Sequence, residues 1–380
     1  MFHQKSSLST KNVDAAVVSG LAELGPRDLM RLSTILKLPY SRVTSSYTRL
    51  RRKFRLRICA APNTDMLSLT HAFFEATPTA EYRRAALQAF EVLRSLNYLA
   101  SNANTPGDLF GLVYVPVGER GSHYLEVFNE LVERGFLERY SIRKFPETAH
   151  YSVRPEYIDW GSGSYVFDWG SLTPRKPEAK LHDTSIRPQA DRIDVLLLKE
   201  LEFDATRSFP EISAQLKERH GFIVSDRLLL YHYQEHLVAR RLFSKYRVDF
   251  SQGEKLGVFV KTQINPNTLD KYSEMVRCIP YLTRELVDPS GHHISVCYVP
   301  SADYQGFLEY VQSKLLPLTS KMELYTSLPG SRSTFTLPYE LFDEEIGWVH
   351  DPIQDAEMVL EKARALKQHG PARFSETLNQ

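Results

Sequence analysis

Apolar residues recur at intervals of three and four along the first 54 residues, and this spacing predicts three helices. Asn12 or Asp14 can cap the first helix, and a second short helix is expected over 28–36. The third helix covers 41–54, with Ser41 as its N-cap. A β-prone tail follows it. This order of elements is that of a helix-turn-helix followed by a wing.

The third helix separates apolar from basic side chains. Val43, Tyr47, Leu50 and Phe54 share one face and are expected to be buried. The run 42–57 holds seven basic residues in sixteen and no acidic one, and Arg, Lys and Ser suit phosphates and base edges of the DNA major groove. The alternative is a solvated basic helix. The residues expected to contact double-stranded DNA are Arg42, Ser45, Ser46, Arg49, Arg51, Arg52, Lys53, Arg55 and Arg57.

A second kind of unit follows. Strand-like and helix-like segments alternate in the order β-α-β-β-α-β, which is the ferredoxin-like arrangement. The expected segments are 67–74, 79–93, 97–101, 109–115, 122–134 and 137–142. Aromatic residues over 153–169 can add a hairpin at the edge of the sheet.

The same order then begins again, so the chain reads as an internal duplication. GDLFGLVYVP at 107–116 matches GHHISVCYVP at 291–300 at an offset of 184 residues. The fold class is therefore α+β, a duplicated winged helix-turn-helix followed by a ferredoxin-like module. The expected division is 12–62 for the first winged unit, 66–169 for the first module, 170–188 for a linker, 189–252 for the second winged unit, 255–345 for the second module and 346–380 for a C-terminal helix and tail. The late helix over 355–368 is either a dimer clasp or part of a solvated tail.

Charge and cysteine content narrow the class of protein. The net charge is only +1 over 380 residues, which favours basic patches on a balanced scaffold over a uniformly basic coating protein. The three cysteines lack the spacing of a disulfide framework or a zinc site, so no metal and no cofactor are expected. No apolar run is long enough to span a membrane, and no signal peptide is evident. A soluble cytoplasmic protein associated with the nucleoid is expected.

The second winged unit is less basic than the first. Asp226 and Glu235 lie on its third helix and would face phosphates unfavourably. Gln pairs well with adenine and Tyr reaches phosphate, so this helix can still read bases. The alternative is a copy that serves packing or dimerisation. The residues expected to contact DNA here are Arg227, Tyr231, Gln234, Arg240 and Arg241, with His232 a further candidate.

The segment DRIDVLLLKELEFDATRSFPEISAQL at 191–216 resembles the opening helices of Lrp/AsnC transcription regulators, and the architecture over 12–345 is similar to a tandem form of that family, expected mostly in archaea. The resemblance implies a sequence-specific regulator that dimerises through its ferredoxin-like modules and senses a small-molecule effector. The family's effector module has Gly followed three residues later by Asp. This chain has Gly107 with Asp108 and Gly291 with His292 and His293. The His pair raises a metal-binding or pH-sensing hypothesis, and an exposed turn is the alternative.

The sequence leaves alternatives open for the oligomeric state and for the biochemical function. One chain can pair its own two modules, but a homodimer with four winged units is favoured because two-fold pairing is the commonest solution. Siroheme decarboxylases share this build and use His and Arg at the module cleft, so His71, His123, His292 and His293 are candidates for such a role. The acid-free basic run and the lack of catalytic motifs favour a protein that is not an enzyme. An architectural chromatin-type DNA binder is the other alternative.

Overall fold

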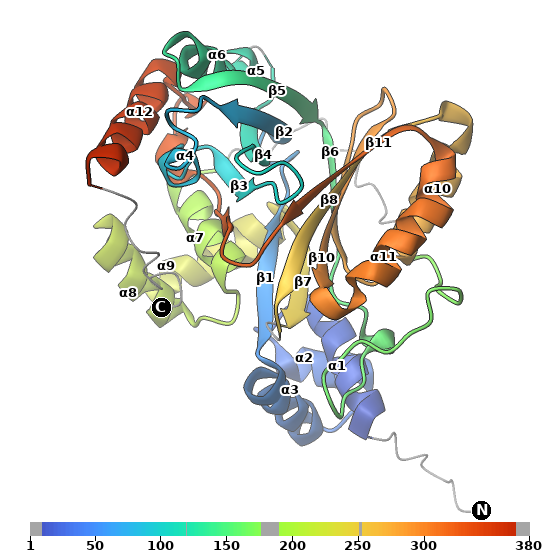
Figure 1. The fold of residues 1–380 in the computed structure, drawn as a ribbon. Coiled ribbons are helices and arrows are strands. Elements are labelled where there is room, and N and C mark those ends of the chain that lie inside the picture. The colour runs from blue at the N-terminus through green and yellow to red at the C-terminus, as the bar shows by residue number, and fades with distance from the viewer. Residues whose placement is uncertain (1–9, 119, 176–189, 251–252, 370–380) are drawn as a thin grey trace, which may run out of the picture.

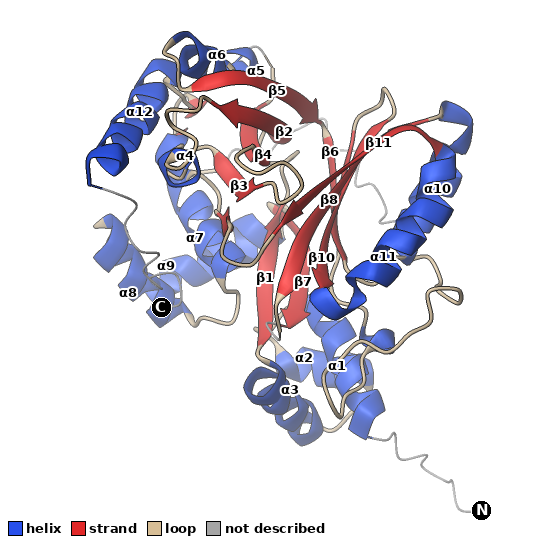
Figure 2. Ribbon diagram, viewed as in Figure 1, coloured by secondary structure: helices blue, strands red, loops and turns tan. Residues whose placement is uncertain are grey.

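The computed structural model describes residues 10–118, 120–175, 190–250 and 253–369, and it is a mixed α+β molecule in which two similar halves are joined (Figures 1 and 2). Most of the expected linker, the residues 176–189, lies outside the described residues, as does the end of the C-terminal tail. Within the described residues, none of the helices combines the length and apolar character needed to cross a membrane.

The first winged unit consists of α1 (Thr10–Leu24), α2 (Leu29–Leu36) and α3 (Tyr40–Phe54), followed by β1 (Leu56–Pro62). The three expected helices are confirmed. The expected cap of the third is wrong, because α3 begins one residue before Ser41 and Pro39 occupies the N-cap position. At its other end Arg55 adopts a left-handed conformation, with φ of 49°, and turns the chain into β1.

The second winged unit consists of α7 (Arg192–Phe203), α8 (Phe209–His220) and α9 (Asp226–Tyr231), and its strand is β7 (Phe243–Phe250). The third helix continues beyond α9 as a π-helical segment, His232–Val238. Capping boxes begin two of these helices, formed by Asp191 with Asp194 and by Ser208 with Glu211. These side chains satisfy backbone N–H groups that have no partner within the helix.

The strand after each winged unit is not a wing of that unit. β1 and β7 instead pair with each other, antiparallel, with Ile58 opposite Val248. Each first helix also packs on the strand of the other half, α1 on β7 and α7 on β1. The expectation of two independent wings is therefore wrong. The two strands form one ribbon that joins the halves.

Both modules have the predicted ferredoxin-like order. The first sheet contains β2 (Leu69–Pro78), β3 (Leu96–Ser101), β4 (Leu109–Pro116) and β5 (Leu137–Phe145), in the order β5-β2-β4-β3. Its helices are α4 (Ala86–Phe90), α5 (Arg120–His123) and α6 (Glu126–Glu133). The second sheet contains β8 (Lys255–Ile264), β9 (Leu282–Val287), β10 (His292–Pro300) and β11 (Thr319–Ser327), in the order β11-β8-β10-β9. Its helices are α10 (Leu269–Cys278) and α11 (Tyr304–Tyr310), which continues as a π-helical turn, Val311–Leu315.

Each sheet gains a fifth strand from the sequence that follows the other module. β6 (Glu147–His150) pairs with β9, and β12 (Arg332–Thr334) pairs with β3. Two short strands, β13 (Phe342–Asp343) and β14 (Gly347–Trp348), form a separate ribbon. The remaining short helices are 3₁₀ turns at Pro155–Tyr157, Pro266–Thr268, Ser301–Asp303, Leu316–Leu318 and Tyr339–Leu341.

The two sheets pack face to face, and helices cover their outer faces (Figure 2). Aromatic rings fill the contact. The ring centroids of Phe73 and Tyr325 lie 5.2 Å apart, and those of Phe110 and Phe259 also lie 5.2 Å apart. The surface expected to form a homodimer is thus covered by the chain's own second module. Pairing of this face with a second chain is corrected to pairing within one chain.

Two segments expected to be loose instead pack on the core. Arg175, placed in the expected linker, donates to the carbonyl oxygens of Ser152 and Pro280 at 3.0 and 3.1 Å. The late helix α12 (Pro352–His369) packs on α4 and α6 of the first module. Its buried Asp355 accepts hydrogen bonds from Arg94 at 2.8 Å and from His350 at 2.7 Å. This helix clasps its own chain and is not a solvated tail.

Candidate functional site

The outer face of α3 is the main basic surface predicted from the sequence, and α3 lies at the end of the molecule opposite α6 (Figure 1). Two shallow hollows, of about 450 and 240 Å³, lie along this helix. Their walls include Ser45, Arg49 and Arg52 in the larger and Ser41 and Arg42 in the smaller. The exposed polar residues of α3 and its flanks are Ser41, Arg42, Ser45, Thr48, Arg51, Arg52, Lys53, Arg55 and Arg57.

Two of the predicted DNA contacts are held by a carboxylate on α1. Ser46 is buried and its hydroxyl donates to a carboxylate oxygen of Asp14, on α1. Arg49 forms an ion pair with the same oxygen, and its side chain is 35% exposed. Asp14 has 3% of its side chain exposed and needs these donors, because a buried carboxylate without partners is costly. Asp14 is therefore a partner of α3 and not a cap of α1, and Ser46 does not belong to the outer face.

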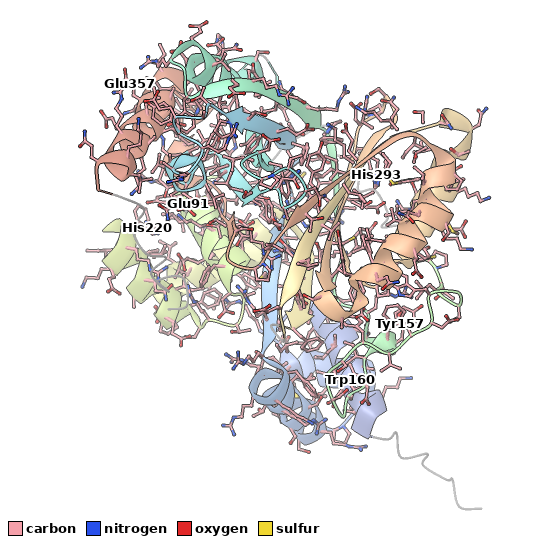
Figure 3. All side chains as sticks on the ribbon, viewed as in Figure 1. Glu91, Tyr157, Trp160, His220, His293 and Glu357 are labelled. Atoms are coloured by element: carbon pink, nitrogen blue, oxygen red, sulfur yellow. The ribbon has the colours of Figure 1, made fainter. Side chains whose placement is uncertain are left out.

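The core side of α3 agrees with the prediction. Val43, Leu50 and Phe54 are buried, and Tyr47 is half-buried. Beneath the helix, Trp160 packs its ring edge-on against Phe54 at 5.9 Å (Figure 3). Lys53 donates to the carbonyl oxygen of Gly161 at 2.8 Å. The aromatic segment after β6 thus supports α3 and does not extend a sheet as a hairpin.

The second winged unit presents a different surface. Arg227, Tyr231, Gln234 and Arg241 are exposed as predicted, while Arg240 is half-buried. Their neighbours are apolar or acidic rather than basic. The exposed residues of this kind are Ile223, Asp226, Leu228, Leu230, Glu235 and Val238. A surface of this composition does not offer the dense positive charge that α3 carries.

The residues expected around an effector lie in separate environments. Gly107 and Gly291 both have positive φ, 97° and 88°, as their turns require. Asp108 is half-buried beside the first turn and His292 is half-buried beside the second. The pKa of His292 is lowered by burial and then by the charge of Arg143. Sensing of a small molecule by these residues remains a prediction.

His293 is fully buried inside the second module, so the alternative of an exposed turn is wrong for this residue (Figure 3). Its Nε2 atom lies 3.0 Å from Glu285, which also accepts from Tyr151 and from Arg277. Burial raises the pKa of Glu285, but the contacts with His293 and Arg277 outweigh it and hold that pKa at about 2. This network fixes β9 against β10 and α10.

A group of basic side chains, three buried and one half-buried, lies where the halves meet, and the sequence prediction missed most of it. We name His71, His150, Arg247 and Arg284 the central basic cluster. Burial, and then the charge of Arg284, lower the pKa of His71 well below its ordinary value. Burial and the charges of Arg284 and Arg247 do the same for His150. Both imidazoles are therefore neutral at neutral pH.

The carboxylate of Glu202 offsets part of the positive charge of this cluster. A chain of hydrogen bonds connects it to Arg284, from the second module through the first module to α7. Arg284 donates to Asn97, whose amide donates to Tyr114 at 3.0 Å. The Tyr114 hydroxyl donates to Glu202 on α7 at 3.1 Å, and Glu202 also accepts from the backbone N–H of Leu337. The charge of Glu202 acts on both guanidinium groups, those of Arg247 and Arg284. An excess of positive charge at the centre suits an anionic ligand.

Several polar atoms of the cluster have no hydrogen-bond partner in the described part of the chain. They are Nε of Arg247, Nε2 of His71 and Nδ1 of His150. Of the histidines named for a decarboxylase role, only His71 belongs here. His123 is exposed and pairs with Glu126, and His293 pairs with Glu285. A signal existed in the sequence, because His71 directly precedes the apolar run Ala72, Phe73 and Phe74 of β2.

Comparisons with known proteins bear on the fold. No protein-family model matches this sequence, and no curated protein matches it. The crystal structure of the siroheme decarboxylase NirDL is similar, with a TM-score of 0.52 and 9% identity, over 94% of this chain and 100% of that chain. NirDL in co-complex with an iron-uroporphyrin III analogue matches with the same values. The likeness is consistent with the Lrp/AsnC-like architecture expected from the sequence, and at this identity it concerns the fold alone.

This likeness corrects one expectation. From the sequence, the acid-free basic run and the lack of catalytic motifs favoured a protein that is not an enzyme. The expectation is wrong, because the structures that match almost the whole chain are those of a decarboxylase. The arrangement of winged units and modules is compatible with catalysis.

Proposed function

We propose that the protein is a regulator that binds double-stranded DNA in a sequence-specific manner through the outer face of α3. The observation that carries the proposal is the exposed row of Arg, Ser and Thr on the third helix of a winged unit, at one end of the molecule. In helix-turn-helix proteins this helix enters the major groove. Its Arg residues match guanine edges and phosphate oxygens, while its hydroxyl groups bond to either.

The contacts of Asp14 with Ser46 and Arg49, which we call the joint between α1 and α3, support the same role. Asp14 holds Arg49 and Ser46 from below, so the orientation of α3 relative to α1 is fixed before DNA is met. Arg42 and Arg52 lie outside this joint, on the exposed side of the helix. A rigid helix that presents cationic side chains loses less conformational freedom on binding.

One chain offers one densely basic reading helix, since the outer face of the second unit's third helix mixes Arg227 with apolar and acidic residues. A single chain should therefore select a single short motif without two-fold symmetry. Two motifs separated by roughly 34 Å would require a second chain. The number of motifs selected thus reports the number of reading helices.

Selection of bound sequences from a random duplex pool, followed by titration of the best sequence at several salt concentrations, tests this proposal. We expect one enriched motif and a logarithmic affinity that falls linearly with logarithmic salt concentration. The double variant Arg42→Ala/Arg52→Ala should weaken binding at least about 10-fold, while Arg83→Ala/Arg84→Ala, which removes the same two charges from exposed residues of the first module, should not. Salt-dependent binding without an enriched motif would indicate an architectural binder. Equal binding by the double variant would refute the assignment to α3.

A second candidate function is that of an enzyme acting on a carboxylate-bearing tetrapyrrole. The observation that favours it is the central basic cluster, in a fold similar to that of a siroheme decarboxylase solved with an iron-uroporphyrin III analogue. Arg247 and Arg284 suit substrate carboxylates, and neutral imidazoles suit proton transfer. Decarboxylation breaks the bond to the carboxylate carbon, releases CO₂ and places a proton on the carbon left behind. The unpartnered nitrogen of His71 or His150 would take up a proton from solvent and deliver it to that carbon.

Absorption spectroscopy with iron-uroporphyrin III separates the two candidates. The enzyme candidate predicts a saturable spectral shift and, under reducing anaerobic conditions, a product lighter by one CO₂ for each carboxylate lost. His71→Gln should abolish the mass change, while His123→Ala, which alters an exposed histidine, should leave it intact. No spectral shift at saturating tetrapyrrole would reject this candidate and leave the DNA-binding proposal standing.

A further inference from the structure

We propose that Asp191, Asp194, His232 and His236 form a binding site for a divalent first-row metal ion, with Zn²⁺ the best match. Each residue offers one ligand atom, and these four atoms lie within 4.8 Å of one another. They come from the start of α7 and from the π-helical segment after α9. The site joins the first and third helices of the second winged unit. The sequence analysis expected no metal and considered His232 only as a reader of DNA bases.

The separations between the ligand atoms suit tetrahedral coordination. Nδ1 of His232 lies 2.8 Å from Oδ1 of Asp194 and 3.6 Å from Oδ2 of Asp191. Nδ1 of His236 lies 3.0 and 3.7 Å from the same two oxygens. Zinc bonds of 2.0–2.1 Å in a tetrahedron place neighbouring ligand atoms roughly 3.3 Å apart. The four observed distances fall on both sides of this value, so small side-chain shifts would be enough to give tetrahedral coordination.

The two carboxylates are already oriented by the capping box of α7. Oδ1 of Asp191 accepts the backbone N–H of Asp194 at 2.9 Å, and Oδ2 of Asp194 accepts the backbone N–H of Asp191 at 3.1 Å. Each carboxylate therefore keeps its other oxygen for the site. Such outer hydrogen bonds hold ligands in position and raise metal affinity.

The histidines reach the carboxylates from a single segment. His232 and His236 are four residues apart, and the chain between them adopts a wide π-helical turn, a feature often found at functional sites. The imidazole ring centroids lie 4.4 Å apart. Both Nδ1 atoms point to the same side, because both lie within 3.0 Å of Oδ1 of Asp194.

Burial gives the site an inner wall and an entrance. The side chain of Asp194 is 0% exposed, that of His232 is 7% and that of His236 is 10%. The side chain of Asp191 is 40% exposed, so an ion can enter from that side. Two carboxylates balance the charge of a divalent ion. Two imidazole nitrogens favour Zn²⁺ and its neighbours over Ca²⁺ or Mg²⁺, which prefer oxygen ligands.

The test is metal binding to the untagged, full-length protein after treatment with a chelator. Titration with Zn²⁺ followed by calorimetry should give one ion per chain, and Co²⁺ should produce the intense visible absorption of a tetrahedral complex. His236→Ala should weaken binding by more than about 100-fold, since loss of an outer partner alone costs 10–100-fold. His123→Ala removes an exposed histidine elsewhere and should bind as the parent does.

Asp191→Asn guards against variants that fail to fold. Asn is as good an N-cap as Asp, so α7 should be retained, which far-UV circular dichroism checks. The affinity of this variant for Zn²⁺ should nevertheless be at least about 10-fold lower than that of the parent. A parent that binds no ion at micromolar concentration, or variants that all bind as tightly as the parent, would overturn the proposal and leave the four residues as a hydrogen-bonded joint.

Discussion

The two winged units hold their third helix in the same way but with different chemistry. In the first unit a buried aspartate on α1, Asp14, binds Ser46 and Arg49 of α3. In the second unit a buried aspartate on α7, Asp194, binds His232 and His236. One architecture thus carries a permanent cation in the first copy and two imidazoles in the second.

The difference extends to the outer surface. The third helix of the first unit carries Arg and Ser outward, while that of the second exposes Leu228, Leu230 and Tyr231. A duplicated chain needs only one copy to keep a given surface. The common joint holds the third helix in both units, while the outer residues of that helix differ.

The largest expected effect on stability comes from removing the aspartate that holds the third helix in each unit. In chelator-treated protein, Asp194→Ala should lower the free energy of unfolding by about 3 kcal/mol and Asp14→Ala by about 2 kcal/mol, because buried donors lose their acceptor. Asp194 is the more buried and also accepts a backbone N–H. Chemical denaturation measures both. Glu218→Ala, on the exposed side of α8, is the control and should change stability by less than about 0.5 kcal/mol. Equal stability of the Asp14 variant and the parent would contradict the shared joint.

Lowering the pH should test the role of the central basic cluster in stability. His71 and His150 have lowered pKa values in the folded protein, so below about pH 6.5 the unfolded chain binds protons that the folded chain does not. Stability is therefore full above that pH and decreases as the pH falls, by at most about 2.5 kcal/mol for the two groups at about pH 5.5. Denaturation curves at about pH 7 and pH 5.5 measure the loss. The double variant His71→Gln/His150→Gln should show a smaller loss, and an unchanged loss would assign the acid sensitivity to other groups.

The outer face of α3 should matter for DNA and not for stability. Arg52→Ala is expected to weaken binding to the selected duplex by about 1–3 kcal/mol, because an exposed guanidinium group is lost from the reading helix. Fluorescence anisotropy at fixed salt concentration measures the change. The free energy of unfolding should stay within about 0.5 kcal/mol of the parent. A variant that binds normally would show that another surface meets the duplex.

The smallest effect is expected in the second unit. Arg227→Ala removes a cation from a surface whose neighbours are apolar or acidic, so DNA affinity should change by less than about twofold, within the roughly 0.5 kcal/mol typical of surface substitutions. The same anisotropy assay measures it beside Arg52→Ala. Equal losses for the two variants would mean that both units read DNA.

The sequence predicted the order of elements well because hydrophobic spacing reflects burial in each local segment. It placed the helices of the first unit and both ferredoxin-like modules. It did not predict the pairing of β1 with β7 or the destinations of β6 and β12, since strand partners far apart in sequence leave no periodic signal.

The sites were predicted only in part for a related reason. The exposed arginines of α3 follow from local charge and spacing. Whether Arg49 points outward depended on Asp14, which lies 35 residues away. The central basic cluster and the four residues of the proposed metal site each join segments that only the fold brings together. His232 and His236 at a spacing of four were the one local sign of the latter.

The exchange of β6 and β12 makes the two halves dependent on each other. If either half were expressed alone, its sheet would lack one strand and its aromatic face would be open to water. The sheet would then have an unpaired edge, and exposed edges of this kind promote aggregation. During evolution such an exchange prevents either copy from being deleted, even after it has lost its original task. The second copy is therefore needed for the fold, whatever chemistry its surface carries.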